Sequence, residues 1–285
     1  MKQKRPESLQ SKINESVRFI RTKSSYKPKI AIILGSGLGD FTNAITQSVV
    51  IETNTIPHYP NITVEGHRGK IVFGKVGSKT ILAFQGRIHY YETGNLETVL
   101  YPIRVAQALG VQTLILTNAA GGVNKTFQAG DLMMITDQIN LTFQNPLKNN
   151  EPARLSRRVG TGGHRVSSIA LYDKKICNII IKVAQEKSID IKRGIYCGVK
   201  GPSYETAAEI EMIRRIGGDA VGMSTVNEVS LAKALGMRVA GISCITNMAT
   251  GISTERLSHA EVTVEANKVK EKFSDLMSGV IKNIG

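Results

Sequence analysis

The sequence predicts one α/β domain over residues 1–285, built on a central mixed, mainly parallel β-sheet flanked by helices. Strand-like and helix-like segments alternate along the chain, which is the order typical of this class. Many strand-like segments are unbroken runs of Val, Ile and Leu, as expected for strands buried on both faces of a sheet. With 41% apolar residues among 285, the chain can bury a large core, and no repeat or low-complexity linker divides it.

Seven segments are predicted to be strands because they are short runs rich in β-branched and other apolar residues. They cover residues 29–34, 70–76, 79–85, 111–117, 131–136, 191–200 and 237–245. Helices are expected between them, near residues 96–109, 173–187, 204–216, 224–235 and 259–282. Gly110, Gly217 and Gly236 follow helical patterns and are expected to end those helices.

An amphipathic helix is expected over residues 7–24, within an N-terminal helical arm of residues 1–27. Its apolar residues recur at spacings of three and four, as on one face of a helix: Leu9, Ile13, Val17 and Ile20. Much of the formal charge of +14 lies in this arm, and residues 144–168 form a second, irregular basic segment. A loop of that length is usually functional or mobile.

Composition and charge weigh against several classes of protein. A nucleic-acid-binding surface would interleave basic with aromatic residues, but aromatic residues are only 5% and Trp is absent. A solvated basic helix and loop that also attract small anions are the favoured interpretation. The three cysteines form no disulfide framework or metal-binding spacing, and neither an apolar signal segment nor a membrane-spanning stretch is present. We expect a cytoplasmic protein that binds no metal, membrane or nucleic acid.

Three predicted strands end in segments of small residues that suit an anion: Gly35–Gly39, Gln85–His89 and Asn118–Gly122. Gly and Ala allow several backbone N–H groups to point at one spot, where an oxyanion can bind. Arg87 adds a planar guanidinium that matches phosphate, and Ser36 adds a hydroxyl. Convergence of these segments would form a site, whereas any one of them alone would be only a turn.

The segment Gly35–Gly39 also invites comparison with a dinucleotide-binding turn, since it follows a strand. The dinucleotide fingerprint requires a third glycine where this chain has Asp40, and a P-loop would require Gly-Lys-Ser/Thr, which is absent. An ordinary strand-to-helix turn explains the segment about as well as a ligand loop does. NAD binding is not expected.

Arg87 and His89 stand two residues apart, so on an extended segment both side chains project to the same face. Arginine supplies a permanent charge, and the protonation of histidine can follow that of a bound anion. Taken alone, the pair is as readily a surface arginine and a packed histidine. His67 is a possible third contributor, although an isolated loop histidine is more often structural.

Further candidates follow later predicted strands. Glu205, in Gly201–Thr206, is expected in the first turn of a helix, either as a cap or as an acceptor for ligand N–H groups. Ser224 is expected at a helix N-cap, and Met223 beside it either fills the core or forms an apolar floor under a ligand. Asn247 ends a strand where open α/β sheets bind ligands, and its amide can both donate and accept.

Taken in order, these segments resemble the trimeric purine nucleoside phosphorylases, in the family that also contains methylthioadenosine phosphorylase. The resemblance runs from about residue 28 to the C-terminus and is interrupted only near 148–170. It rests on eight segments: Gly35–Gly39, Glu65–His67, Gln85–Glu92, Asn118–Val123, Gln144–Leu147, Gly201–Glu209, Gly218–Thr225 and Thr246–Asn247. Eight segments in the same order are far more specific than any one of them.

The resemblance implies a role for each matching residue. The implied phosphate site consists of Ser36, His67, Arg87, His89, the backbone N–H of Ala119, and Ser224. The implied purine site consists of Tyr204, Glu205 and Asn247, and the implied ribose site of Tyr91, Met223 and His259. Catalytic roles fall to His89, Glu205 and Asn247. The resemblance also implies inorganic phosphate as co-substrate, no metal or organic cofactor, and a homotrimer.

The implied reaction is phosphorolysis of inosine, guanosine and their 2′-deoxy forms to free base and pentose 1-phosphate. Members that act on 6-oxopurines carry a glutamate at Glu205 and an asparagine at Asn247, whereas methylthioadenosine enzymes place an aspartate at the latter position. Methylthioadenosine phosphorylase is the alternative within the family. A non-catalytic nucleoside or nucleic-acid binder is the alternative from another class, because the N-terminus is basic.

Two positions depart from the family pattern. Met248 stands where animal members have a lysine, so no cationic help at the purine O6 is expected. Lys148–Val166 replaces a stretch that normally lends an aromatic residue to the ribose site of the neighbouring subunit. Since no aromatic residue occurs between Phe143 and Tyr172, that contact is expected to be missing or aliphatic.

Overall fold

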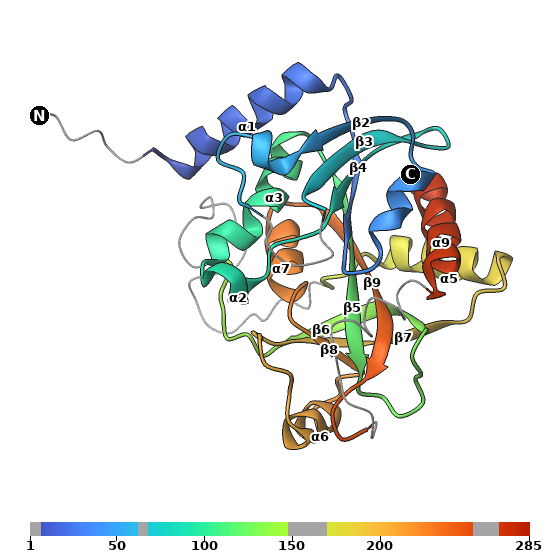
Figure 1. The fold of residues 1–285 in the computed structure, drawn as a ribbon. Coiled ribbons are helices and arrows are strands. Elements are labelled where there is room, and N and C mark those ends of the chain that lie inside the picture. The colour runs from blue at the N-terminus through green and yellow to red at the C-terminus, as the bar shows by residue number, and fades with distance from the viewer. Residues whose placement is uncertain (1–6, 62–67, 148–169, 253–267) are drawn as a thin grey trace, which may run out of the picture.

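Helices and strands alternate as predicted, and Figure 1 traces them along the chain. The computed structural model describes residues 7–61, 68–147, 170–252 and 268–285. The strands are β1 (Ile30–Leu34), β2 (Thr46–Glu52), β3 (Lys70–Val76), β4 (Lys79–Gln85), β5 (Thr113–Gly122), β6 (Leu132–Asn140), β7 (Ile191–Gly198), β8 (Ala220–Gly222) and β9 (Arg238–Met248). The α-helices are α1 (Leu9–Lys23), α2 (Tyr90–Thr93), α3 (Leu96–Ala108), α5 (Lys174–Glu186), α6 (Ala207–Arg215), α7 (Val226–Ala234) and α9 (Lys270–Asn283), with 3₁₀ turns η1 (Gly39–Ala44) and η2 (Thr53–Thr55).

The strands form one mixed sheet in the order β2-β3-β4-β1-β5-β8-β7-β6-β9. β1 lies between β4 and β5 and runs parallel to both, and five of the nine pairings among the described strands are parallel. The predicted mixed, mainly parallel sheet is therefore confirmed. β5 also pairs with β9, so that β5, β8, β7, β6 and β9 close into a ring, a closure that the sequence does not indicate.

Helices cover both faces of the sheet, as Figure 1 shows, with α1, α3 and α7 on one side and α5 and α9 on the other. β1 explains this arrangement, because its five residues are all buried and its side chains alternate between the faces. Ala31 and Ile33 pack in the core with α1 and α3, whereas Ile30, Ile32 and Leu34 pack in the core with α5 and α9. A strand buried on both faces needs the continuous apolar run that the sequence contains.

Three helices end as predicted at glycines. Gly110, Gly217 and Gly236 have φ angles of 97°, 95° and 83°, in the left-handed region that glycine adopts without a steric penalty. The residue after each glycine donates its N–H back to the last helical turn, at 2.9–3.1 Å for Val111, Gly218 and Met237. These are Schellman-type ends that satisfy otherwise unpaired carbonyl groups.

Several predicted bounds are wrong, and three of them concern the candidate site. Asn118–Gly122, predicted as a loop, continues strand β5 because this segment pairs with β9 and then with β8. Glu205 lies before α6 rather than in its first turn, since the N-cap is Thr206. Ser224 likewise precedes the N-cap of α7, which is Thr225.

The prediction also omits short or partly exposed elements. β2 carries mostly exposed side chains and β8 spans three residues, so neither has an apolar run that marks a buried strand. β6 continues to Asn140 because β7 pairs with it to that point. The N-terminal residues 1–6, most of the basic segment 144–168 and the beginning of the predicted helix 259–282 lie outside the described residues. None of the described helices has the length and apolar composition to cross a membrane.

The turn after β1 packs tightly against β5. A Cβ atom on Gly35 would lie 2.7 Å from the Cα of Asn118 and 2.8 Å from the carbonyl oxygen of Thr117, and both are backbone atoms that cannot turn away. The Gly35 N–H donates to the Thr117 hydroxyl at 3.2 Å, and that hydroxyl donates to the Ile33 carbonyl at 2.9 Å. The absence of a side chain at Gly35 therefore lets the residue that follows β1 pack against the middle of β5.

We expect Gly35→Ala to lower the free energy of unfolding by about 1–3 kcal/mol, because the added methyl group overpacks a backbone contact. Gly39→Ala in the same turn is the matched control, since the nearest atom to its Cβ would be 4.0 Å away. Chemical denaturation of both variants measures the effect. Equal stability of the two variants would contradict this account of the turn.

Candidate active site

A single pocket lies at the carboxyl ends of the parallel strands β1, β4, β5 and β9. Open α/β sheets commonly bind ligands at this edge. Every predicted site residue within the described ranges lines the pocket: Ser36, Arg87, His89, Tyr91, Ala119, Tyr204, Glu205, Met223, Ser224 and Asn247. His67 and His259 lie outside the described residues. The structure thus brings together side chains from segments up to about 210 residues apart in the sequence.

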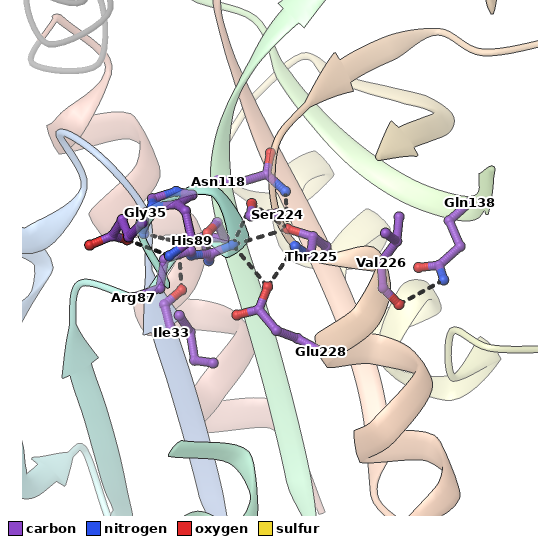
Figure 2. Close-up of polar contacts among 12 residues, drawn as sticks. Ile33, Gly35, Arg87, His89, Asn118, Gln138, Ser224, Thr225, Val226 and Glu228 are labelled. Carbon is purple, nitrogen blue, oxygen red and sulfur yellow. Dashed lines mark hydrogen bonds and ion pairs between the residues drawn. The ribbon is translucent and has the colours of Figure 1, made fainter. Parts of the chain in front are cut away.

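Arg87 follows β4 and points its guanidinium across β5 toward the start of α7 (Figure 2). The residue is 3% exposed. Its Nη1 donates to the hydroxyl of Ser224 at 2.7 Å and to that of Thr225 at 3.0 Å, and its Nη2 donates to the Thr117 carbonyl. The carboxylate of Glu228 lies 3.4 Å from Nη1 and balances the charge. A cation so deeply buried needs such a partner.

The short turn between β8 and α7 has an unusual backbone. Thr225 has φ 75° and ψ −55°, a combination that β-branched residues rarely adopt. Its N–H donates to Oε2 of Glu228 at 2.5 Å, and its hydroxyl accepts from Nδ2 of Asn118 at 2.9 Å as well as from Arg87. Hydrogen bonds to the N–H and to the hydroxyl of Thr225 stabilise this strained conformation. The turn also places Ser224 in the pocket wall.

His89 is held by the short helix that it begins. Its backbone N–H donates to Oε1 of Glu92, and its Nδ1 lies 3.3 Å from the same oxygen. The ring stacks on Tyr91, with centroids 5.0 Å apart and planes inclined by 13°. Because Glu92 engages the Nδ1 side of the imidazole, the ring orientation is fixed by two partners.

A second group of residues faces the pocket from the segment before α6 and from the end of β9. Partial burial raises the pKa of the Glu205 carboxyl, and Glu209 adds a smaller effect in the same direction. The Asn247 Oδ1 accepts from the Thr246 hydroxyl at 3.0 Å, while its Nδ2 donates to the Met248 carbonyl at 3.3 Å. An amide held in this way offers a defined donor face.

The segment that precedes α6 also closes one side of the pocket. Gly201 has φ 66°, and a Cβ there would lie 2.3 Å from Sδ of Met223 and 3.0 Å from the ring of Tyr91. Close approach at Gly201 therefore brings these two side chains to the same wall. Tyr204, 45% exposed, lies at the pocket rim, where an aromatic ring can cover a bound planar group.

Several residues with evident roles in this geometry were not predicted: Glu92, Asn118, Thr225, Glu228 and Thr246. Two of them carry a signal in the sequence. Glu228 stands three residues after Thr225, which is the spacing of a capping box, and Glu92 stands three residues after His89. Asn118 carries no such signal, since its contact with Thr225 joins segments 107 residues apart, and Thr246 acts only through its neighbour Asn247.

The pocket brings together two different chemical capacities. One half contains a buried guanidinium, an oriented imidazole and two serine hydroxyls, which together suit an oxyanion. The other half contains a carboxylate and an amide beside an aromatic ring, which suit a planar heterocycle with N–H donors and acceptors. Elsewhere, Glu7, Glu15 and His58 place potential metal ligands within 4.8 Å of one another, but they do not line the pocket.

Comparison with known proteins identifies the family. The family model described as "Phosphorylase superfamily" matches residues 29–282. Purine nucleoside phosphorylase 1 of Bacillus subtilis is 45% identical over 96% of this chain and 98% of its own length. Purine nucleoside phosphorylase of Rattus norvegicus is 37% identical over 94% of this chain and 93% of its own length.

The fold comparison agrees with the sequence comparison. The crystal structure of Schistosoma mansoni purine nucleoside phosphorylase in complex with adenosine superposes with a TM-score of 0.85 and 31% identity. It covers 96% of this chain and 97% of its own chain. The chain therefore belongs to the phosphorylase superfamily and, within it, to the purine nucleoside phosphorylases.

Proposed function

We propose that this enzyme cleaves inosine, guanosine and their 2′-deoxy forms with inorganic phosphate, giving the free purine and (deoxy)ribose 1-phosphate. One observation carries the proposal: the oxyanion-binding half and the heterocycle-binding half face the same pocket. A phosphate and a nucleoside bound there would lie next to each other. The relatives named above support a purine nucleoside phosphorylase rather than a methylthioadenosine phosphorylase.

In this proposal, phosphate is held by Ser36, Arg87, His89, the N–H of Ala119, and Ser224, with His67 as a further contributor. Arg87 supplies permanent charge in a buried setting, where its attraction for a dianion is strong. The Ser224 hydroxyl accepts from Arg87 and would donate its own O–H to phosphate. Tyr91, Met223 and His259 form the proposed ribose site.

The purine half supports a preference for 6-oxopurines. The Glu205 carboxylate would accept hydrogen bonds from the purine N1–H and the 2-amino group. The Asn247 amide would meet O6 and N7, while Tyr204 covers the base. Adenine lacks the N1–H, so Glu205 would be left as an unpaired acceptor, at a cost of roughly 1–3 kcal/mol.

The reaction needs no nucleophilic side chain, because phosphate is the nucleophile. A phosphate oxygen forms a bond to C1′ as the bond from C1′ to purine N9 breaks, through an oxocarbenium-like transition state. The dianion stabilises the positive charge that develops on the sugar, and holding both reactants in register removes an entropic cost. Asn247 stabilises the negative charge on the departing purine, which then takes up a proton.

The proposal also covers cofactors, cellular role, oligomeric state and partners. No metal or organic cofactor enters the proposed reaction, and we propose a role in purine salvage in the cytoplasm. We propose a homotrimer, as the family resemblance implies. The segment Lys148–Val166 would then decide whether a neighbouring subunit contacts the ribose. A nucleic acid partner is not part of the proposal.

The test of the proposal is turnover of inosine, guanosine, adenosine and methylthioadenosine, with and without inorganic phosphate. Adenosine belongs in the panel because the Schistosoma structure contains it. We expect strict phosphate dependence and a kcat/KM for adenosine at least tenfold below that for inosine, from the unpaired carboxylate. Release of base at the same rate without phosphate would refute phosphorolysis, and binding of RNA without turnover would favour the non-catalytic alternative.

Substitution Asn247→Asp tests the base-recognition half. A carboxylate accepts where the amide donates, so it can meet the 6-amino group of adenine but repels O6 of hypoxanthine. We expect the ratio of kcat/KM for adenosine to that for inosine to rise at least tenfold. Phosphate KM serves as the internal control, since Asn247 belongs to the other half of the pocket. An unchanged ratio would remove Asn247 from base recognition.

Substitution Glu205→Gln tests the electrostatics of the same half. Because the folded-state pKa of Glu205 is raised above its usual 4.5, the ionised carboxylate opposes folding at pH 7. We expect the variant to have a higher free energy of unfolding than the parent at pH 7, with the difference vanishing as the pH falls below about 4.5. Its kcat/KM for inosine should fall at least tenfold. Denaturation curves at pH 7 and pH 4, together with inosine kinetics, measure both effects.

A further inference from the structure

Glu228 is the buried carboxylate behind the oxyanion-binding half of the pocket. It is 3% exposed and does not line the pocket, so it cannot touch a bound substrate. Its Oε2 atom accepts from the Thr225 N–H at 2.5 Å and lies 3.4 Å from Nη1 of Arg87 (Figure 2). One carboxylate oxygen thus holds two separate parts of the site.

The first of these parts is the guanidinium of Arg87. A buried arginine without a counter-charge would be strongly disfavoured and would turn toward solvent or recruit another anion. With Glu228 behind it and the Thr117 carbonyl on Nη2, the guanidinium plane is fixed before any ligand arrives. Preorganised donors of this kind bind an anion without a cost of reorganisation.

The second part is the turn that presents Ser224. Thr225 lies at φ 75°, a strained conformation for a β-branched residue, and its N–H bond to Glu228 opposes relaxation of that turn. Relaxation would swing the neighbouring Ser224 hydroxyl, which is 2.7 Å from Nη1 of Arg87. The serine and the arginine are therefore held in register by the same carboxylate.

An ordinary helix cap looks different in this chain. α6 begins with a capping box in which Thr206 donates its N–H to Glu209 at 2.7 Å, and both α6 and α7 are nine residues long. There the glutamate is exposed and the N-cap residue has φ −72°. Glu228 shares this cap geometry but adds burial, a strained N-cap and an ion pair with a site arginine.

We propose that Glu228 is a positioning residue for phosphate, acting through Arg87 and through the Thr225 turn. The inference rests on the proposed function, since it takes the ligand of Arg87 and Ser224 to be phosphate. It predicts an effect confined to one substrate. Loss of the carboxylate should weaken phosphate binding and leave the nucleoside half of the pocket unchanged.

The experiment compares Glu228→Gln with the parent enzyme by steady-state kinetics, varying phosphate and inosine in turn. We expect the phosphate KM to rise at least tenfold while the inosine KM stays within twofold, because only the anion-binding half loses its support. Glu209→Gln is the matched control: it removes the equivalent cap charge on α6, and its phosphate KM should equal that of the parent. A purely structural role for Glu228 would lower Tm and the active fraction without separating the two KM values.

A double substitution tests the route of the effect. If Glu228 acts largely through Arg87, the two substitutions should not act independently. The fold-increase in phosphate KM of the double variant Glu228→Gln/Arg87→Ala should be well below the product of the fold-increases of the two single variants. Should Glu228→Gln give no folded protein, Glu228→Asp is the second variant, because it keeps the charge but withdraws it by one methylene. We expect its phosphate KM to rise while its inosine KM stays unchanged.

The results distinguish two failures. A phosphate KM within twofold of the parent in the Glu228 variant, or an equal rise in both KM values, would overturn the positioning role while phosphorolysis stands. Absence of phosphate dependence in the parent enzyme would overturn the proposed function, and the positioning role with it.

Discussion

The structure of the site depends on how one permanent positive charge is buried. Arg87 is almost fully enclosed, and its terminal nitrogens have partners on segments distant in sequence. The middle of β5 supplies the Thr117 carbonyl, and the turn before α7 supplies two hydroxyls and, one helical turn later, a carboxylate. A buried guanidinium satisfied in this way tolerates little displacement of those segments, so the charge organises the strand ends around it.

This arrangement explains how an enzyme can act without a reactive side chain. In the proposed reaction the substrate groups carry the chemistry, and the protein contributes fixed dipoles, a buried guanidinium and a shared pocket. The backbone contributes too, since the absence of a side chain at Gly35 lets the turn after β1 pack against the backbone of β5 beside the pocket. The fold itself therefore has to place the phosphate and the nucleoside precisely relative to each other.

Much of this organisation is visible in the sequence, and the parts that are not share a physical reason. Buried strands such as β1 and glycine-ended helices such as α3 are local patterns, and they were predicted to within a few residues. Arg87, Glu205 and Asn247 were predicted because each follows a strand-like run at the edge where ligands bind. Asn118 was missed as a side-chain partner, because its hydroxyl acceptor on Thr225 lies 107 residues away. Glu228 was missed although its capping-box spacing was present, because that spacing does not reveal a buried ion pair.

The closed ring formed by β5, β8, β7, β6 and β9 has a consequence for solubility. A strand within a ring has a neighbouring strand on each side, which limits the row of unpaired backbone groups that it offers to another molecule. Among the described strands, β2 alone ends the order with a single neighbour. Its register with β3 is interrupted between Thr46 and Val49, and most of its side chains are exposed, including Thr46, Gln47 and Ser48. An irregular, polar border of this kind discourages intermolecular strand addition, so the topology protects the protein from aggregating through its sheet.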